Sequence, residues 1–189
     1  MNKKLTTKDL TYIALCAVLL AVCSWIYVPF AVPFTLQTFG VFCTLLLLGG
    51  KRGTISIVVF ILMAAIGLPV LSGFRGGIAA LLGTTGGYIL GFVLAGFIYW
   101  VGTSRFPGKT AKEQRVSATV RKVICLAVGL IVCYAFGTAW FMYLYAKGSG
   151  AIGLGTALSW CVLPFIIPDI IKLALAVFVS GRIGKRIDI

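Results

Sequence analysis

Long apolar runs recur along the whole of this 189-residue chain, and they limit its possible folds more than any other feature. A helix that crosses the hydrocarbon of a bilayer needs about 20 mostly apolar residues, and several runs approach or exceed that length. The runs are continuous and lack the alternation of membrane β-barrels, which favours helices. We therefore predict an all-α membrane protein with one domain, residues 1–189, and no room for a separate soluble catalytic domain.

Six transmembrane helices are predicted from these runs. Their approximate ranges are 10–28, 35–50, 54–71, 80–101, 122–146 and 157–181. The polar segment Gly49-Gly-Lys-Arg-Gly53 separates the second helix from the third. Both of these helices are short for a membrane span, so we expect them to be tilted or partly re-entrant.

The basic residues are divided unevenly between the two predicted faces of the membrane. Of 17 lysines and arginines, 14 fall before the first helix, at 51–52, within 102–122 or after position 181. Only Arg75 and Lys147 are assigned to the other face. Basic loops stay in the cytoplasm, which predicts that both termini and the 102–121 loop are cytoplasmic in a multi-pass protein of the cell (plasma) membrane. The net charge of +13 therefore needs no nucleic-acid partner to explain it.

Asp169 is the only acidic residue inside the predicted apolar runs, and Lys172 follows one helical turn later. A charge deep in a bilayer costs about 2.5–3.5 kcal/mol on insertion scales, so it usually has a functional or pairing reason to be there. The spacing allows an ion pair that only eases insertion. Pro168 is expected to break the helix, which would place Asp169 in the first turn of a new segment, where the helix dipole favours an anion. Ion pair and ligand site both remain open.

A second candidate site is the glycine-rich sequence on the outward side, in 72–77 and 83–88. Paired glycines let a ligand approach backbone N–H groups, but they also let membrane helices pack closely. Arg75 lies between these segments and favours the ligand interpretation.

Several functional classes are disfavoured. The chain has no histidine, and its six cysteines lie in apolar runs without a C-x-x-C pair, which argues against a metal site or a Cys–His nucleophile. The segment from Gly102 to Thr110 looks like a P-loop, but its spacing is one residue too long and no strand precedes it. We expect no enzymatic activity, no cofactor and no bound metal.

Five segments in order resemble the BioY family. They are VPFTLQTFG at 32–40, LLGGKRG at 47–53, AIGLPV at 65–70, GTTGGYILGF at 83–92 and PFIIPDIIK at 164–172. Thr84 and Pro168 stand where the family usually has proline and glycine. The resemblance implies six helices and a biotin-binding S component of an energy-coupling factor (ECF) transporter. It also implies two kinds of partner, a transmembrane coupling subunit and a pair of ATPases, which would supply the nucleotide site that this chain lacks.

The resemblance and the chemistry of biotin together give a set of substrate-binding candidates. Asp169 would accept a hydrogen bond from a ureido N–H, while Lys172 would donate to the ureido oxygen or hold the carboxylate in place. Arg75 or Lys147 would meet the valerate carboxylate at the outer mouth. The remaining candidates are Tyr88, Gly76, Gly77, Gly86, Gly87, Gln37 and Thr38.

Ala14, Ala17 and Ala21 place small residues along one face of the first helix. Small residues let another membrane helix approach, and the resemblance assigns Ala17 and Ala21 to docking on the coupling subunit. On the residues alone, packing inside the bundle is the favoured interpretation.

Two alternative functions remain open at this stage. One is a self-sufficient ion-coupled secondary transporter that uses Asp169. It is disfavoured because the two halves show no internal repeat and only one carboxylate is embedded. The other is an S component for a different vitamin.

Overall fold

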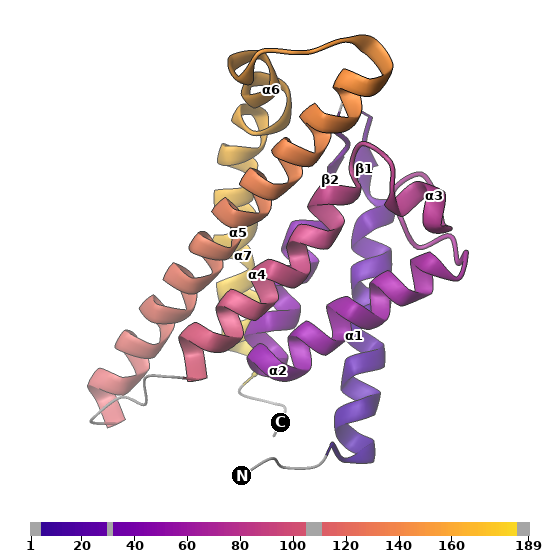
Figure 1. Cartoon of the computed structure of the whole chain (residues 1–189). Coiled ribbons are helices and arrows are strands. Elements are labelled where there is room, and N and C mark those ends of the chain that lie inside the picture. Colours follow the sequence, from indigo (N-terminus) through magenta and orange to yellow (C-terminus); the bar gives the residue numbers. More distant parts are fainter. Residues whose placement is uncertain (1–4, 30–31, 105–110, 185–189) are drawn as a thin grey trace.

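The computed structural model describes residues 5–29, 32–104 and 111–184, without the side chains of 111–117. Its helices are α1 (Thr7–Trp25), α2 (Gln37–Ala65), α3 (Ile78–Leu81), α4 (Gly86–Ser104), α5 (Ala111–Ser149), α6 (Leu154–Cys161) and α7 (Leu163–Ile183). Two short antiparallel strands, β1 (Tyr27–Val28) and β2 (Phe34–Thr35), form a hairpin between α1 and α2. The predicted all-α membrane class is confirmed (Figure 1).

The predicted second and third spans form one element, α2, that bends sharply at Gly49. There φ is 75° and ψ is 176°, a conformation that is easy for glycine and unfavourable for other residues. Figure 1 shows the two limbs of α2 running in opposite senses from this bend. The predicted break is therefore confirmed, although the second limb resumes directly after Gly49 rather than at position 54. The predicted last span corresponds to α6 and α7 together.

One end of the bundle collects the start of α1, the bend of α2, the end of α4 and the end of α7 (Figure 1). There Arg52 Nη2 lies 2.9 Å from Asp9 Oδ1, so an ion pair links the first turn of α1 to the second limb of α2. Asp9 also forms a capping box with Thr6. This is the end to which the sequence assigned the basic loops, although 1–4, 105–110 and 185–189 lie outside the described residues. The cytoplasmic orientation of this end stays a prediction.

Glycines bring α4 and α5 into close contact. A Cβ atom at Gly87 would lie 2.3 Å from Trp140 Cβ, and one at Gly137 would lie 2.2 Å from the ring of Tyr88. Neither position has room for a larger side chain, as expected where small residues let membrane helices approach. The packing of Gly137 presses the Tyr88 ring against α5, which fixes one wall of the cavity described below.

Two of the three alanines proposed for docking are buried within the chain. Ala17 and Ala21 are only 1% and 3% exposed and belong to the main hydrophobic core, whereas Ala14 is exposed. This agrees with the packing interpretation of these small residues, and their docking role stays a prediction. The exposed face of α1 instead carries larger apolar residues, Leu15, Val18 and Val22.

Candidate functional site

A cavity lies toward the end of the bundle that carries the β1–β2 hairpin. The space between its walls is about 650 Å³, a volume that includes the part open to solvent. Aromatic and aliphatic side chains from α4, α5 and α7 form much of its wall. Its lining includes Gln37, Thr38, Tyr88, Phe92, Tyr134, Phe165, Asp169 and Lys172.

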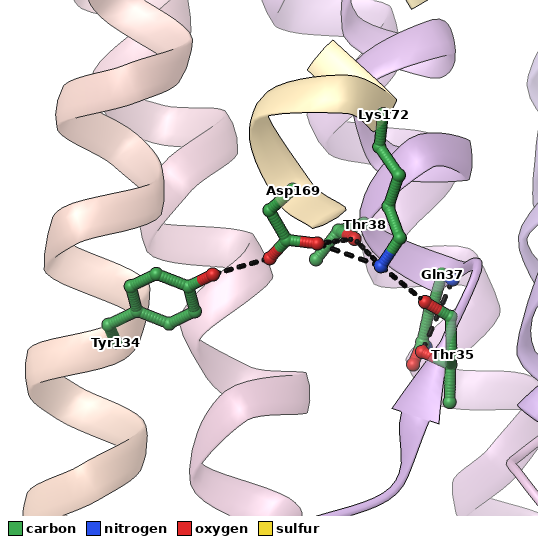
Figure 2. Close-up of polar contacts among 6 residues, drawn as sticks. All are labelled: Thr35, Gln37, Thr38, Tyr134, Asp169 and Lys172. Atoms are coloured by element: carbon green, nitrogen blue, oxygen red, sulfur yellow. Dashed lines mark hydrogen bonds and ion pairs between the residues drawn. The ribbon is translucent and has the colours of Figure 1, made fainter. Parts of the chain in front are cut away.

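Asp169 is 1% exposed and is bound from three sides. Its Oδ1 accepts from Lys172 Nζ at 2.7 Å and from Thr38 Oγ1 at 2.9 Å, while its Oδ2 accepts from the hydroxyl of Tyr134 (Figure 2). The carboxylate thus joins α7 to α2 and α5. Buried charges are tolerated when they are paired and hydrogen-bonded, and this one is both.

Lys172 is 5% exposed, and its ammonium group uses all three of its N–H donors. They go to Asp169 Oδ1 at 2.7 Å, the backbone oxygen of Thr35 at 2.7 Å and Thr38 Oγ1 at 3.1 Å (Figure 2). Nζ also lies 4.1 Å from the centre of the Phe34 ring, a cation–π contact. In this arrangement Lys172 holds Asp169 and strand β2 in place and has no donor left for a ligand.

Within the described part of the chain, the carboxylate of Asp169 has one acceptor position without a partner. An ionised carboxylate offers about four lone-pair sites, and the three bonds above occupy two on Oδ1 and one on Oδ2. Asp169 also lines the cavity. The remaining position on Oδ2 is the one that an N–H donor of a ligand would use.

The predicted helix break at Pro168 is wrong. α7 begins at Leu163, and Pro168 lies inside it, so Asp169 is in the second turn of the helix rather than the first. The break falls instead at Val162, where φ is −128° and ψ is −55°. Proline keeps a φ close to helical values, and at position 168 it removes only the bond to the carbonyl of Pro164. The carboxylate is therefore stabilised by Lys172 and two hydroxyl groups, not by a helix N-terminus.

Tyr88 and Gln37 were predicted from the sequence, and both line the cavity. The Tyr88 hydroxyl is 2.9 Å from Thr138 Oγ1, so it is already engaged with α5. Gln37 is 6% exposed, and within the described part of the chain its Nε2 has no hydrogen-bond partner. Thr38, also predicted, belongs to the ion-pair network.

The structure places the predicted glycines outside the cavity lining. A Cβ atom at Gly76 would lie 2.2 Å from the backbone oxygen of Leu68, and one at Gly86 would lie 1.7 Å from that of Leu81. Gly77 and Gly87 are likewise absent from the lining, Gly77 with a φ of 89° that glycine readily adopts. In this structure these four glycines form tight turns and close packing contacts.

The two outward basic residues also lie outside the lining. Arg75 is exposed, and its Nε donates to the backbone oxygen of Ser72 at 3.1 Å. Ser72 lines the cavity, so Arg75 is linked to the cavity wall through this hydrogen bond. Lys147 is exposed and lies 4.4 Å from the centre of the Tyr143 ring.

Sequence reasoning missed Tyr134, whose hydroxyl binds Asp169 from α5. The residue lies in the middle of a long apolar run, where a tyrosine ring is unremarkable as a packing residue. Its signal was its position, since a hydroxyl far from both ends of a membrane helix needs a partner.

The chain has relatives throughout its length. The profile of the BioY family matches residues 1–188. A probable biotin transporter BioY of Pyrococcus horikoshii is 38% identical over 177 residues, which cover 93% of this chain and 96% of that protein. The biotin transporter BioY of Thermotoga maritima is 34% identical over 168 residues, or 88% and 90% of the two chains. The crystal structure of the S component for biotin from an ECF-type ABC transporter is similar, with a TM-score of 0.77, 31% identity and coverage of 98% and 95%.

Proposed function

This chain belongs to the BioY family, and on that premise we propose that it captures biotin as the S component of an ECF-type ABC transporter. Capture takes place from the outer face of the cell membrane, on the side of the β1–β2 hairpin. The proposal is supported by relatives named as biotin transporters and by the likeness to a solved S component for biotin.

The observation that carries the proposal is the buried Asp169 carboxylate with a free acceptor position inside a largely apolar cavity. Biotin has a compact bicycle whose urea edge carries N–H groups, and a hydrogen bond from such a group to a carboxylate is stronger than a neutral one. Phe92 and Phe165 line the same cavity and offer ring surface to the apolar part of the bicycle. A small number of polar groups in an apolar wall is the usual composition of a small-molecule site.

The valerate carboxylate requires a second polar contact, at the outer end of the cavity. Arg75 is our candidate, because it is bonded to Ser72 and Ser72 lines the cavity.

Energy for uptake would come from partner proteins, a transmembrane coupling subunit and a pair of ATPases. Docking through Ala17 and Ala21 would require that the face of α1 on which they are buried becomes accessible.

Calorimetry on the purified, detergent-solubilised chain tests the proposal. We expect biotin to bind in about a one-to-one ratio without added nucleotide. Thiamine and riboflavin serve as matched controls, and neither is expected to bind. Binding of one of these vitamins in place of biotin would overturn the substrate assignment, and sodium- or proton-driven biotin uptake by the chain alone in liposomes would favour a secondary transporter.

A further inference from the structure

Gln37 is the first residue of α2 and lines the cavity, yet its amide nitrogen is buried without a hydrogen-bond partner among the described residues. Leaving a buried donor unsatisfied costs about 1–3 kcal/mol, so most such groups are paired. The other buried polar side-chain atoms without partners belong to Thr44, Tyr99, Arg121 and Ser180, and none of these residues lines the cavity. Among the described residues, Gln37 is therefore the one member of this group whose side chain borders the cavity.

The other buried polar side chains of the cavity already take part in hydrogen bonds within the protein. Lys172 donates its three N–H groups to Asp169, Thr35 and Thr38. The hydroxyl of Tyr88 is engaged with Thr138. The amide of Gln37 has two N–H groups, and rotation about its terminal bond can turn them toward the cavity.

The cavity therefore offers an unused acceptor, Asp169 Oδ2, and an unused amide donor, Gln37. A urea edge is the complement of this pair, because it carries N–H donors beside a carbonyl acceptor. We propose that Gln37 is a specificity-determining residue that donates a hydrogen bond from its side-chain amide to the ureido oxygen of biotin. The inference rests on the proposed function, and it assigns the ureido oxygen to Gln37 rather than to Lys172.

The first test replaces Gln37 by methionine, which has a similar length and no hydrogen-bonding amide. Because the amide is unsatisfied without ligand, Gln37→Met should leave the melting temperature of the ligand-free protein unchanged or higher. Biotin affinity should fall about tenfold, the usual loss for one neutral hydrogen bond. A residue that only supported the fold would lower the melting temperature as well.

The second test changes the ligand at the same atom. In 2-iminobiotin an imino group replaces the ureido oxygen, and at neutral pH the protonated form only donates there. Gln37→Glu should therefore weaken biotin and favour 2-iminobiotin, shifting the ratio of the two affinities by at least about tenfold relative to wild type. Phe92→Leu, a change in the apolar wall, is the matched control and should weaken both ligands alike.

The outcomes separate the two proposals. Failure of the wild type to bind biotin would overturn the proposed function and this inference with it. A wild type that binds biotin, together with Gln37→Met of unchanged affinity, would overturn the inference alone. Loss of ligand-free stability in Gln37→Met, or an unchanged affinity ratio in Gln37→Glu, would also overturn it.

Discussion

Replacing the Asp169–Lys172 pair by neutral residues separates a ligand contact from an ion pair that only eases membrane insertion. The decisive variant carries Asp169→Asn and Lys172→Met together. Its reference is the wild type, in which the buried pair is intact.

The expected magnitudes follow from the burial of the pair. Asp169 and Lys172 are 1% and 5% exposed, and Asp169→Asn alone would leave the ammonium group buried without its counter-charge. Removing one partner of a buried ion pair costs about 3–5 kcal/mol of stability, so we expect this single variant to be strongly destabilised. In the double variant no charge is left unpaired, and most of that stability should return. Losing a charged acceptor for the ureido N–H costs about 1.5–3 kcal/mol, or roughly ten- to a hundredfold in affinity.

Thermal unfolding in detergent, followed by biotin calorimetry on the folded protein, measures both quantities. We expect the double variant to be more stable than Asp169→Asn and to bind biotin at least about tenfold more weakly than the wild type. Biotin affinity in the double variant equal to that of the wild type would refute Asp169 as a ligand contact.

Two further predictions concern packing. Ala21 is 3% exposed, so Ala21→Leu should overpack the core and cost about 1–3 kcal/mol of stability, measured by thermal unfolding. Leu15→Ala, on the exposed face of α1, is the control and should leave stability nearly unchanged. An unchanged melting temperature in Ala21→Leu would contradict the packing of this face in the core. Gly137→Ala places a Cβ atom 2.2 Å from the Tyr88 ring, so it should lower the melting temperature and weaken biotin binding. Gly148→Ala is its control, because a Cβ atom at Gly148, on the same helix, would have no atom within 4 Å. Equal effects of the two changes on melting temperature and binding would show that contact with Tyr88 does not matter.

The sequence predicted the membrane fold well, because length and hydropathy are sufficient to identify spanning segments. It also located the bend of α2 from its glycines, since few other residues tolerate a positive φ. It failed at Pro168, because proline usually breaks a helix but here lies inside α7, which continues through it. In a membrane the neighbouring helices and hydroxyl side chains keep such a helix intact.

The polar site was predictable in part. Asp169 and Lys172 stood out because charges are rare in apolar runs. Tyr134 and the backbone oxygen of Thr35 did not, since a tyrosine is common in a membrane helix and a carbonyl leaves no trace in the sequence. The roles of Ala17 and Gly86 were undecided for a related reason. Small residues serve docking, ligand approach and internal packing equally well, and only the face on which they lie distinguishes these uses.

The Asp169 network links ligand binding to the folded state. Its members come from β2, α2, α5 and α7, so the free acceptor on Oδ2 exists only when these elements are packed together. A ligand that binds only the native state adds about 2.7 kcal/mol of stability when its concentration is 100 times Kd. Biotin should therefore raise the melting temperature of the wild type in proportion to the logarithm of its concentration above Kd. The same rise should appear in the Asp169→Asn, Lys172→Met double variant only at biotin concentrations at least about tenfold higher, and a rise at unchanged concentration would mean that biotin is held elsewhere in the molecule.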